Sequence, residues 1–506
     1  MSNICNKLES LFKVVCLALL LASCGEAEPE AAKQLALQDQ PQSTQLAAKP
    51  SETVAPEPFP MPKMLSEREQ EHLLEALAGA ELFNKVMLTK AQTGRVVAPD
   101  QRRNLEKAQL DLQEIKDKLS ALSKSGLPTY ALLHSLKNDV VLRSWLIGPD
   151  GGIVSGFYDR EYQGLGFMAK GLGVVALAKS RGPRPEGEPP VPPTEIRKRV
   201  KRDQSPAAVA ERVATLDQTL DMLLPGNIAE VLGSRSGRLL VIPARDSGTA
   251  PYAALPLKNG VAAMNWSFVV LPAVGMLTAI DDFFDIKKLN INKAIIVGNP
   301  DLRWDPNADW DDLPSAEKEA RSVAAKLSDR STRLLIGAEA TRDNFVKAIQ
   351  TSPDAGIIYM ATHAVANPKL PLTQGYMAMA GEHYYAGHVR QENFEGWKRH
   401  HPLVIMSACQ TTLGRFLDGG GFGVATTWIT AGAGQVVGSL WNVSDNATAI
   451  LMDSFVDGLK NGLVPEVAMQ RAQIKTMNYT SKRGNQIYRN DPKMWASFTV
   501  YGKPSI

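Results

Sequence analysis

Two patterns of apolar positions divide the chain. Between residues 65 and 124 the apolar side chains recur at helical spacing, which predicts helices over 65–93 and 100–124. From about residue 206, short runs of consecutive apolar residues alternate with helical patterns. Strands that are apolar on both faces and separated by helices predict a mostly parallel sheet covered on both sides, an α/β fold. The predicted strands are 238–244, 293–300, 355–364, 402–410 and 434–441, and the predicted helices are 315–327, 341–350, 423–432 and 447–460.

Two further segments stand outside this alternation. β-rich runs on either side of the sequence PDGG predict a hairpin at 140–158. Residues 181–203 are rich in proline and basic side chains, which favours a solvated insertion. The alternative for this insertion is a nick site for a trypsin-like protease.

The first 30 residues have the features of an export signal. Lys7 and Lys13 lie in or beside a basic start, and residues 14–22 form an apolar run too short to span a bilayer comfortably. The run ends in Leu-Ala-Ser-Cys, which resembles the lipobox of bacterial lipoproteins. This resemblance implies that residues 1–23 are a signal peptide and that Cys24 is lipidated; a plain secretory signal is the alternative. The expected location is the bacterial cell envelope, on the periplasmic side of the outer membrane, with the lipid on Cys24 holding the protein to the membrane.

The composition predicts three parts after this signal. Residues 24–62 are rich in Ala, Glu, Gln and Pro, which predicts a disordered tether. Residues 63–127 form a helical segment that we expect to hold a regulatory protein partner, and residues 128–506 form the α/β domain. The formal net charge is only +3, and no predicted folded segment carries a strong basic stripe, so we expect no binding to nucleic acid.

Cysteine usage draws attention to one residue. The chain has four cysteines, and three of them lie in the first 24 residues. Cys5 and Cys16 would leave with the signal, and Cys24 would carry lipid. Cys409 is then the one free thiol of the mature chain, in an envelope that tends to oxidise thiols. Such a cysteine is either buried and inert or reactive.

Cys409 and His363 each stand at the end of a predicted strand. If these two strands are adjacent and parallel, both side chains emerge at the same edge of the sheet. A cysteine nucleophile requires this arrangement, because imidazole generates the thiolate and later protonates the leaving group. On spacing alone, a buried structural cysteine beside a core histidine is the alternative.

The sequences around both residues resemble CHAT domains, the caspase-like peptidase domains often found with tetratricopeptide repeats. The two strand ends read MATHA and MSACQT, matching the His-Ala and Ser-Ala-Cys signatures. The resemblance covers about residues 130–506 and implies a caspase-like three-layer αβα sandwich, with the helices at 65–124 outside it. Further matching segments, in the expected order, are 239–257, 294–302, 313–320 and 431–448.

This resemblance implies a cysteine endopeptidase that cleaves a protein or peptide substrate without a cofactor. Cys409 would attack the scissile carbonyl, His363 would be the acid and base, and the backbone N–H groups of Ala364 and Cys409 would bind the oxyanion. Family members often have glycine where Ala364 stands, but a backbone donor needs glycine only where φ is positive. The alternatives are a catalytically silent scaffold for protein interactions and acyl transfer through the same thiol.

The loop after the last predicted parallel strand should line the cleft. Trp441, Asn442 and Asp445 are therefore candidate contacts for substrate. For Asp445 we favour a structural role, such as capping the following helix. If it points into the primary pocket instead, a basic residue before the cleaved bond would be preferred.

Neither a metal nor a nucleotide site is predicted. The histidines at 383, 388, 400 and 401 match no standard zinc spacing, and we expect solvated loop side chains. The glycine-rich stretch 418–428 lacks the Lys-Ser/Thr of a phosphate-binding loop, which favours a flexible loop beside Cys409.

Overall fold

A computed structural model describes most of the chain after residue 64. The described residues are 65–78 and 101–506, except 138–139, 166–204, 273, 279–282, 306–309, 328–331, 367–373, 393, 410, 412–413, 418–419, 442 and 482. The predicted signal peptide, Cys24, the tether, the insertion at 181–203 and Asn442 lie outside them. The chain divides into two compact units, Met1–Glu57 and Pro58–Ile506. All described residues belong to the second unit, which also contains the boundary expected at 127/128.

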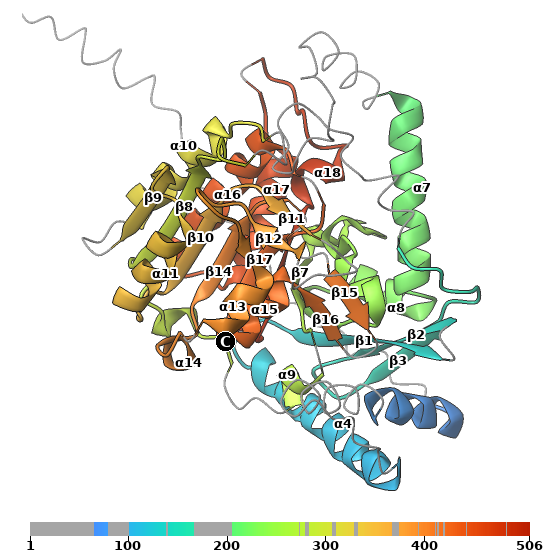
Figure 1. The fold of residues 1–506 in the computed structure, drawn as a ribbon. Helices are drawn as coiled ribbons and strands as arrows, with labels where there is room; N and C mark the ends of the chain where they lie inside the picture. Colours follow the sequence, from blue (N-terminus) through green and yellow to red (C-terminus); the bar gives the residue numbers. More distant parts are fainter. Residues whose placement is uncertain are drawn as a thin grey trace, which may run out of the picture. The chain divides into compact units, whose positions relative to one another are not determined.

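One mixed sheet forms the centre of this unit (Figure 1). Its strands are β1 (Thr129–Lys137), β2 (Val141–Ile147), β3 (Ile153–Phe157), β4 (Gly237–Ile242), β7 (Trp266–Val270), β8 (Ala294–Pro300), β9 (Arg333–Gly337), β10 (Ile357–Ala361), β14 (Leu403–Ser407), β17 (Gln435–Ser439) and β18 (Phe498–Gly502). Among the described residues these eleven strands are ordered β3-β2-β1-β4-β7-β18-β17-β14-β10-β8-β9. Most neighbours are parallel, and the exceptions are β1–β2, β2–β3 and β17–β18. The five predicted strands and the hairpin are confirmed.

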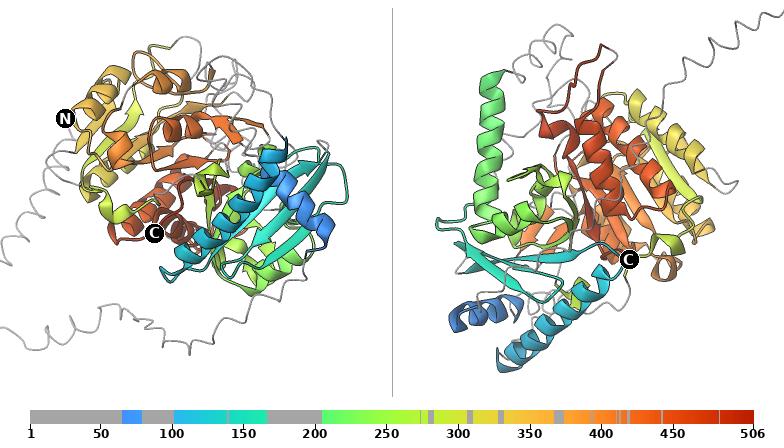
Figure 2. Two further views of the ribbon diagram at one scale, coloured as in Figure 1. Left: turned by 90° about the horizontal axis from the view of Figure 1, so that it is seen from below. Right: turned by 180° about the vertical axis from the view of Figure 1, so that it is seen from behind.

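Helices cover both faces of the sheet, which confirms the α/β prediction (Figures 1 and 2). Ala320 and Phe455 pack against Tyr359 on one face, while Trp428 packs in the cluster of Met360 on the other. Consecutive strand residues such as 359 and 360 point to opposite faces, so an unbroken apolar run supplies both layers. The helices are α4 (Gln101–Ser123), α7 (Pro206–Leu223), α8 (Asn227–Ser234), α9 (Gly275–Thr278), α10 (Pro314–Lys326), α11 (Arg342–Thr351), α13 (Ala386–Gln391), α14 (Trp397–His400), α15 (Val424–Thr430), α16 (Asp445–Lys460), α17 (Pro465–Met477) and α18 (Pro492–Trp495).

The N-terminal helices pack on the sheet rather than standing apart from it. A helix at 67–78 begins with a capping box, in which Ser66 and Glu69 each bond the other's backbone N–H. None of the helices in the described part of the chain has the length and apolar character needed to cross a membrane. The apolar layer that joins this helix and α4 to the strands includes Leu77, Leu119 and Leu133.

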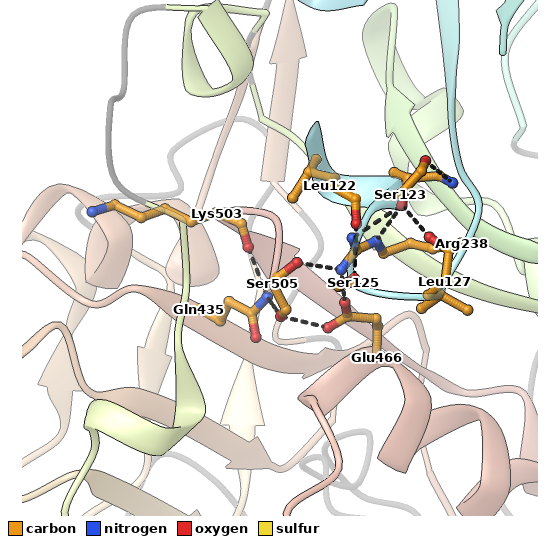
Figure 3. Close-up of polar contacts among 10 residues, drawn as sticks. Leu122, Ser123, Ser125, Leu127, Arg238, Gln435, Glu466, Lys503 and Ser505 are labelled. Atoms are coloured by element: carbon orange, nitrogen blue, oxygen red, sulfur yellow. Dashed lines mark hydrogen bonds and ion pairs between the residues drawn. The ribbon is translucent and has the colours of Figure 1, made fainter. Parts of the chain in front are cut away.

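A buried ion pair links strand β4 to helix α17 (Figure 3). Arg238 of β4 and Glu466 of α17 are each 1% exposed, and 2.7 Å separates Nη1 from Oε1. The guanidinium also donates to the Ser505 carbonyl and to Thr129 Oγ1, while Ser505 Oγ donates to Glu466 Oε2 at 2.8 Å. Gln435 Nε2 of β17 donates to the same hydroxyl. The pair therefore fixes the chain after β18 against both β4 and α17.

A second buried polar group lies on β1. His134 is 3% exposed, with Nδ1 2.9 Å from Ser144 Oγ and Nε2 3.0 Å from Tyr252 Oη. Burial lowers the pKa of His134 to about 3, because its charged form would lose hydration. The folded protein therefore keeps this imidazole neutral over the usual pH range.

We predict that His134 makes the protein sensitive to acid. In the unfolded chain a histidine binds a proton near pH 6.5, so stability should fall below that pH by about 1.4 kcal/mol per pH unit until about pH 3. At pH 5 this loss is about 2 kcal/mol. Urea unfolding at pH 7 and pH 5 should show a smaller difference for His134→Gln than for the wild type, while the exposed control His400→Ala should not change it. Equal pH differences in all three proteins would refute this assignment.

Candidate functional site

The predicted pair follows the ends of two strands, β10 and β14. These strands are adjacent and parallel, as predicted, and their last paired residues are Ala361 and Ser407. His363 and Cys409 each follow two positions later, so they occupy equivalent places on neighbouring strands about 5 Å apart. Both residues therefore lie at the carboxyl edge of the sheet, beyond the ends of neighbouring strands.

The thiol of Cys409 is enclosed. Cys409 is 0% exposed and belongs to the apolar cluster beneath α10 and α16. The Val443 N–H, in the loop between β17 and α16, donates to Sγ at 3.2 Å. An N–H donor favours the anionic form of an acceptor, so this contact stabilises negative charge on the sulfur.

A backbone carbonyl orients the imidazole of His363, which is 1% exposed. Nε2 lies 2.7 Å from the Asp311 carbonyl oxygen. Because a carbonyl only accepts, Nε2 carries the proton and Nδ1 is the basic nitrogen of the neutral ring. Trp310, which precedes Asp311 in the chain, packs on the imidazole ring with 4.9 Å between the ring centroids. The loop before α10 therefore fixes both the plane and the tautomer of His363.

The backbone after His363 directs one N–H away from its neighbouring strand. Ala364–Val365 (β11) pairs with Tyr376–Met377 (β12), and the Ala378 N–H donates to the His363 carbonyl. In this antiparallel pattern Ala364 and Met377 form a non-hydrogen-bonded pair, so the Ala364 N–H points away from β12. Its direction is compatible with the predicted role of an oxyanion donor.

Ser439 and Thr411 clamp the backbone on both sides of Cys409. Ser439 Oγ donates to the Ala408 carbonyl, and the Ser439 N–H donates to Thr411 Oγ1 at 2.8 Å. Thr411 N–H donates back to Ser439 Oγ at 3.3 Å. Both residues are essentially inaccessible to solvent. The carboxyl end of β17 thus fixes the turn that presents the cysteine.

The three candidate pocket residues have different outcomes. Asp445 is 3% exposed and its Oδ2 accepts the Ser315 N–H at 3.2 Å, at the start of α10. This is a structural contact of the kind favoured from the sequence. Trp441 is half-buried, and its Nε1 donates to the Lys493 carbonyl at 3.1 Å. Asn442 lies outside the described residues.

Of the four histidines expected to be solvated loop side chains, His400 is exposed and His388 and His401 are half-buried. The expectation is wrong for His383. It is 7% exposed, its Nε2 lies 2.9 Å from Asp305 Oδ2, and Tyr376 stacks on it with 4.2 Å between centroids. Burial lowers the pKa of His383, and Asp305 opposes this shift in part. Two of its aromatic neighbours, Trp304 and Trp310, are distant from it in the sequence. A local sequence pattern could therefore not predict that His383 is buried. No group of three or more metal-binding side chains occurs within the described ranges.

The glycine-rich stretch after Cys409 is more regular than expected. Gly414–Leu417 (β15) and Gly420–Gly423 (β16) form an antiparallel hairpin that leads directly into α15. Residues 420–423 are therefore a strand, where the sequence favoured a flexible loop over 418–428. Glycines masked the strand signal because they supply no side-chain alternation.

Comparisons with known proteins identify a family and a similar fold. Residues 213–503 match the model of the CHAT domain family. Mouse tetratricopeptide repeat protein 28 is 25% identical over an alignment of 247 residues, which covers 41% of this chain but only 9% of the mouse protein. The Saccharomyces cerevisiae separase–securin complex contains a similar fold, with a TM-score of 0.54, 9% identity, and coverage of 88% of this chain and 35% of that one. The Arg specific cysteine proteinase gingipain R matches with a TM-score of 0.38 and 11% identity, over 61% of this chain and 69% of that one.

Proposed function

The chain belongs to the CHAT domain family, and from this premise we propose that it is a cysteine endopeptidase that uses Cys409 and His363. The observation that carries the proposal is the register of β10 and β14, which gives both residues equivalent positions at one sheet edge. The Val443 donor on Sγ and the Asp311 acceptor on Nε2 agree with a thiolate beside a basic Nδ1.

The proposed reaction follows from these groups. The Cys409 thiolate forms a C–S bond with the scissile carbonyl carbon, and the negative oxygen is met by N–H groups such as that of Ala364. Nδ1 of His363, which took the thiol proton of Cys409 when the thiolate formed, gives that proton to the leaving amine nitrogen as the C–N bond breaks. Water then attacks the thioester while Nδ1 takes its proton, which releases the acid and regenerates the thiol.

The burial of both residues implies that the enzyme is held inactive until triggered. A substrate carbonyl cannot approach a sulfur atom that is 0% exposed. An activator would have to displace a covering segment, such as the loop that carries Val443. We place the binding of a regulatory protein on residues 63–127, because α4 packs on the sheet through β1. A catalytically silent scaffold is the second candidate function, and the same complete burial of Cys409 favours it.

We further propose that the mature chain is anchored in the bacterial envelope by lipid on Cys24. This rests on the apolar run and the Leu-Ala-Ser-Cys sequence before the cleavage position. The anchor would place the peptidase on the periplasmic side of the outer membrane. Fatty-acid labelling that is unchanged in Cys24→Ala would contradict the anchor.

Labelling with a biotinylated peptidyl acyloxymethyl ketone tests the endopeptidase proposal. The purified full chain should be labelled slowly until a trigger is supplied, and the label should be absent from Cys409→Ala in every condition. If the site is triggered, adding an envelope extract should increase labelling of the wild type only. Equal labelling of both proteins, or none with and without extract, would favour the scaffold instead.

A further inference from the structure

The loop between β8 and α10 holds the acceptor that orients His363. This loop carries Trp310, which packs on the imidazole, and Asp311, whose carbonyl accepts from Nε2. Trp310 is itself fixed, because its Nε1 donates to Asp305 Oδ2 at 2.8 Å. The position of the Asp311 carbonyl therefore depends on what anchors this loop on its other side.

Asn299 provides that anchor. Its Nδ2 donates to Asp312 Oδ1 at 2.8 Å, and its Oδ1 accepts the Leu313 N–H at 3.0 Å. One side-chain amide thus forms hydrogen bonds with both of the residues that directly follow Asp311. With Trp310 fixed on the preceding side, the Asp311 carbonyl is held from both directions.

The backbone of Asn299 is suited to this position. It lies near the end of β8, the strand next to β10, from which the chain continues to His363. Its φ is 43°, in the left-handed region that asparagine tolerates better than most residues with a side chain. Glycine would accept the same backbone but would lose both side-chain bonds.

We propose that Asn299 is a positioning residue for His363. By fixing the loop around Asp311, its amide keeps the carbonyl in place for the Nε2–H group, which leaves Nδ1 as the proton acceptor. The effect of Asn299 on catalysis rests on the proposed endopeptidase function. The alternative is that Asn299 only anchors the start of α10, which would affect stability and leave the imidazole unchanged.

Two substitutions at Asn299 and one control separate these roles. Asn299→Gly keeps the left-handed backbone and removes both bonds. Asn299→Asp retains an acceptor for the Leu313 N–H, loses the donor to Asp312 and sets two carboxylates against each other. The control Asn344→Ala removes a comparable bond, from Nδ2 to the Glu339 carbonyl, at the start of α11.

The first readout is the reaction of Cys409 with a peptidyl chloromethyl ketone, measured with the envelope extract that supplies the trigger. Misplacing the group that orients a catalytic histidine commonly costs large factors, so we expect the maximal inactivation rate to fall about 10- to 100-fold in Asn299→Gly. The concentration for half-maximal rate should change by less than about twofold, because Asn299 does not bind the probe. Asn299→Asp should lie between Asn299→Gly and the wild type, and Asn344→Ala should match the wild type.

The second readout is the tautomer of His363, and it does not require activity. In protein labelled with ¹⁵N-histidine, the His363 signals, assigned by their loss in His363→Gln, should show a protonated Nε2 in the wild type and a mixture in Asn299→Gly. An unchanged tautomer and rate, with only a lower Tm as in Asn344→Ala, would overturn the proposal. If the wild-type thiol never reacts, the endopeptidase function fails, while the tautomer still decides the role of Asn299.

Discussion

Replacing His363 with alanine should slow the reaction of Cys409 with a peptidyl electrophile by about 100-fold or more, the usual contribution of a positioned acid–base group. Without the imidazole, the position after β10 no longer supplies a base for the thiol proton, whereas the Val443 N–H still donates to Sγ. The measurement is the rate of inactivation over a range of probe concentrations, with the labelled protein detected by intact-mass spectrometry.

The control for His363→Ala is His400→Ala, which changes an exposed histidine at the end of α14. It should react at the wild-type rate. Iodoacetamide makes no peptide-like contacts with the site, so its rate reports how readily the thiolate forms. A slower rate in His363→Ala would therefore not be caused by weaker binding of the peptidyl probe. If His363→Ala and the wild type are alkylated equally fast, the cysteine is not activated by this histidine and the pair is structural.

Glu466→Ala should lower the free energy of unfolding by about 3–5 kcal/mol. The substitution leaves the Arg238 guanidinium charged and 1% exposed without its carboxylate, and Ser505 Oγ loses its acceptor. Water cannot readily replace the missing partner at such depth. Urea unfolding followed by circular dichroism and by tryptophan fluorescence measures the change and tests whether one transition accounts for it.

Glu317→Ala is the matched control for Glu466→Ala. Glu317 pairs with Arg321 one turn along α10, where both side chains are at least one-third exposed, and such pairs contribute about 0.5 kcal/mol or less. A double change of Arg238→Met and Glu466→Leu should recover most of the lost stability, because it removes both buried charges. Similar losses in Glu466→Ala and Glu317→Ala would mean that the buried pair is dispensable.

Local sequence patterns were sufficient to predict the strands that carry the site. Unbroken apolar runs end at His363 and Cys409, and the structure confirms that β10 and β14 are parallel neighbours. The helices between the strands follow from their apolar spacing and from caps such as Thr341, whose side chain accepts the Asn344 N–H. These features depend on near neighbours in the chain, which is why a single sequence reveals them.

The groups that orient the two residues could not be predicted in this way. The acceptor for His363 is the backbone carbonyl of Asp311, which any residue type could supply. Ser439 contacts the backbone around Cys409 through a hydroxyl that is indistinguishable in sequence from a surface serine. The asparagine of the sequence GNP at 298–300 was a usable signal, because an asparagine at a strand end is a frequent left-handed or capping residue.

The central place of β18 has a consequence for synthesis on the ribosome. β18 lies between β7 and β17, although β7 ends at Val270 and β18 begins at Phe498. For roughly ten seconds or more at usual rates of translation, a nascent chain therefore holds the β7 edge of its first half-sheet unpaired. Once β17 has been made, the second half-sheet adds another unpaired edge until β18 arrives. Arg238 likewise lacks its ion-pair partner until Glu466 has been synthesised. Such open strand edges are recognised by other unfinished chains, so this protein should need protection by chaperones until residue 502 has emerged.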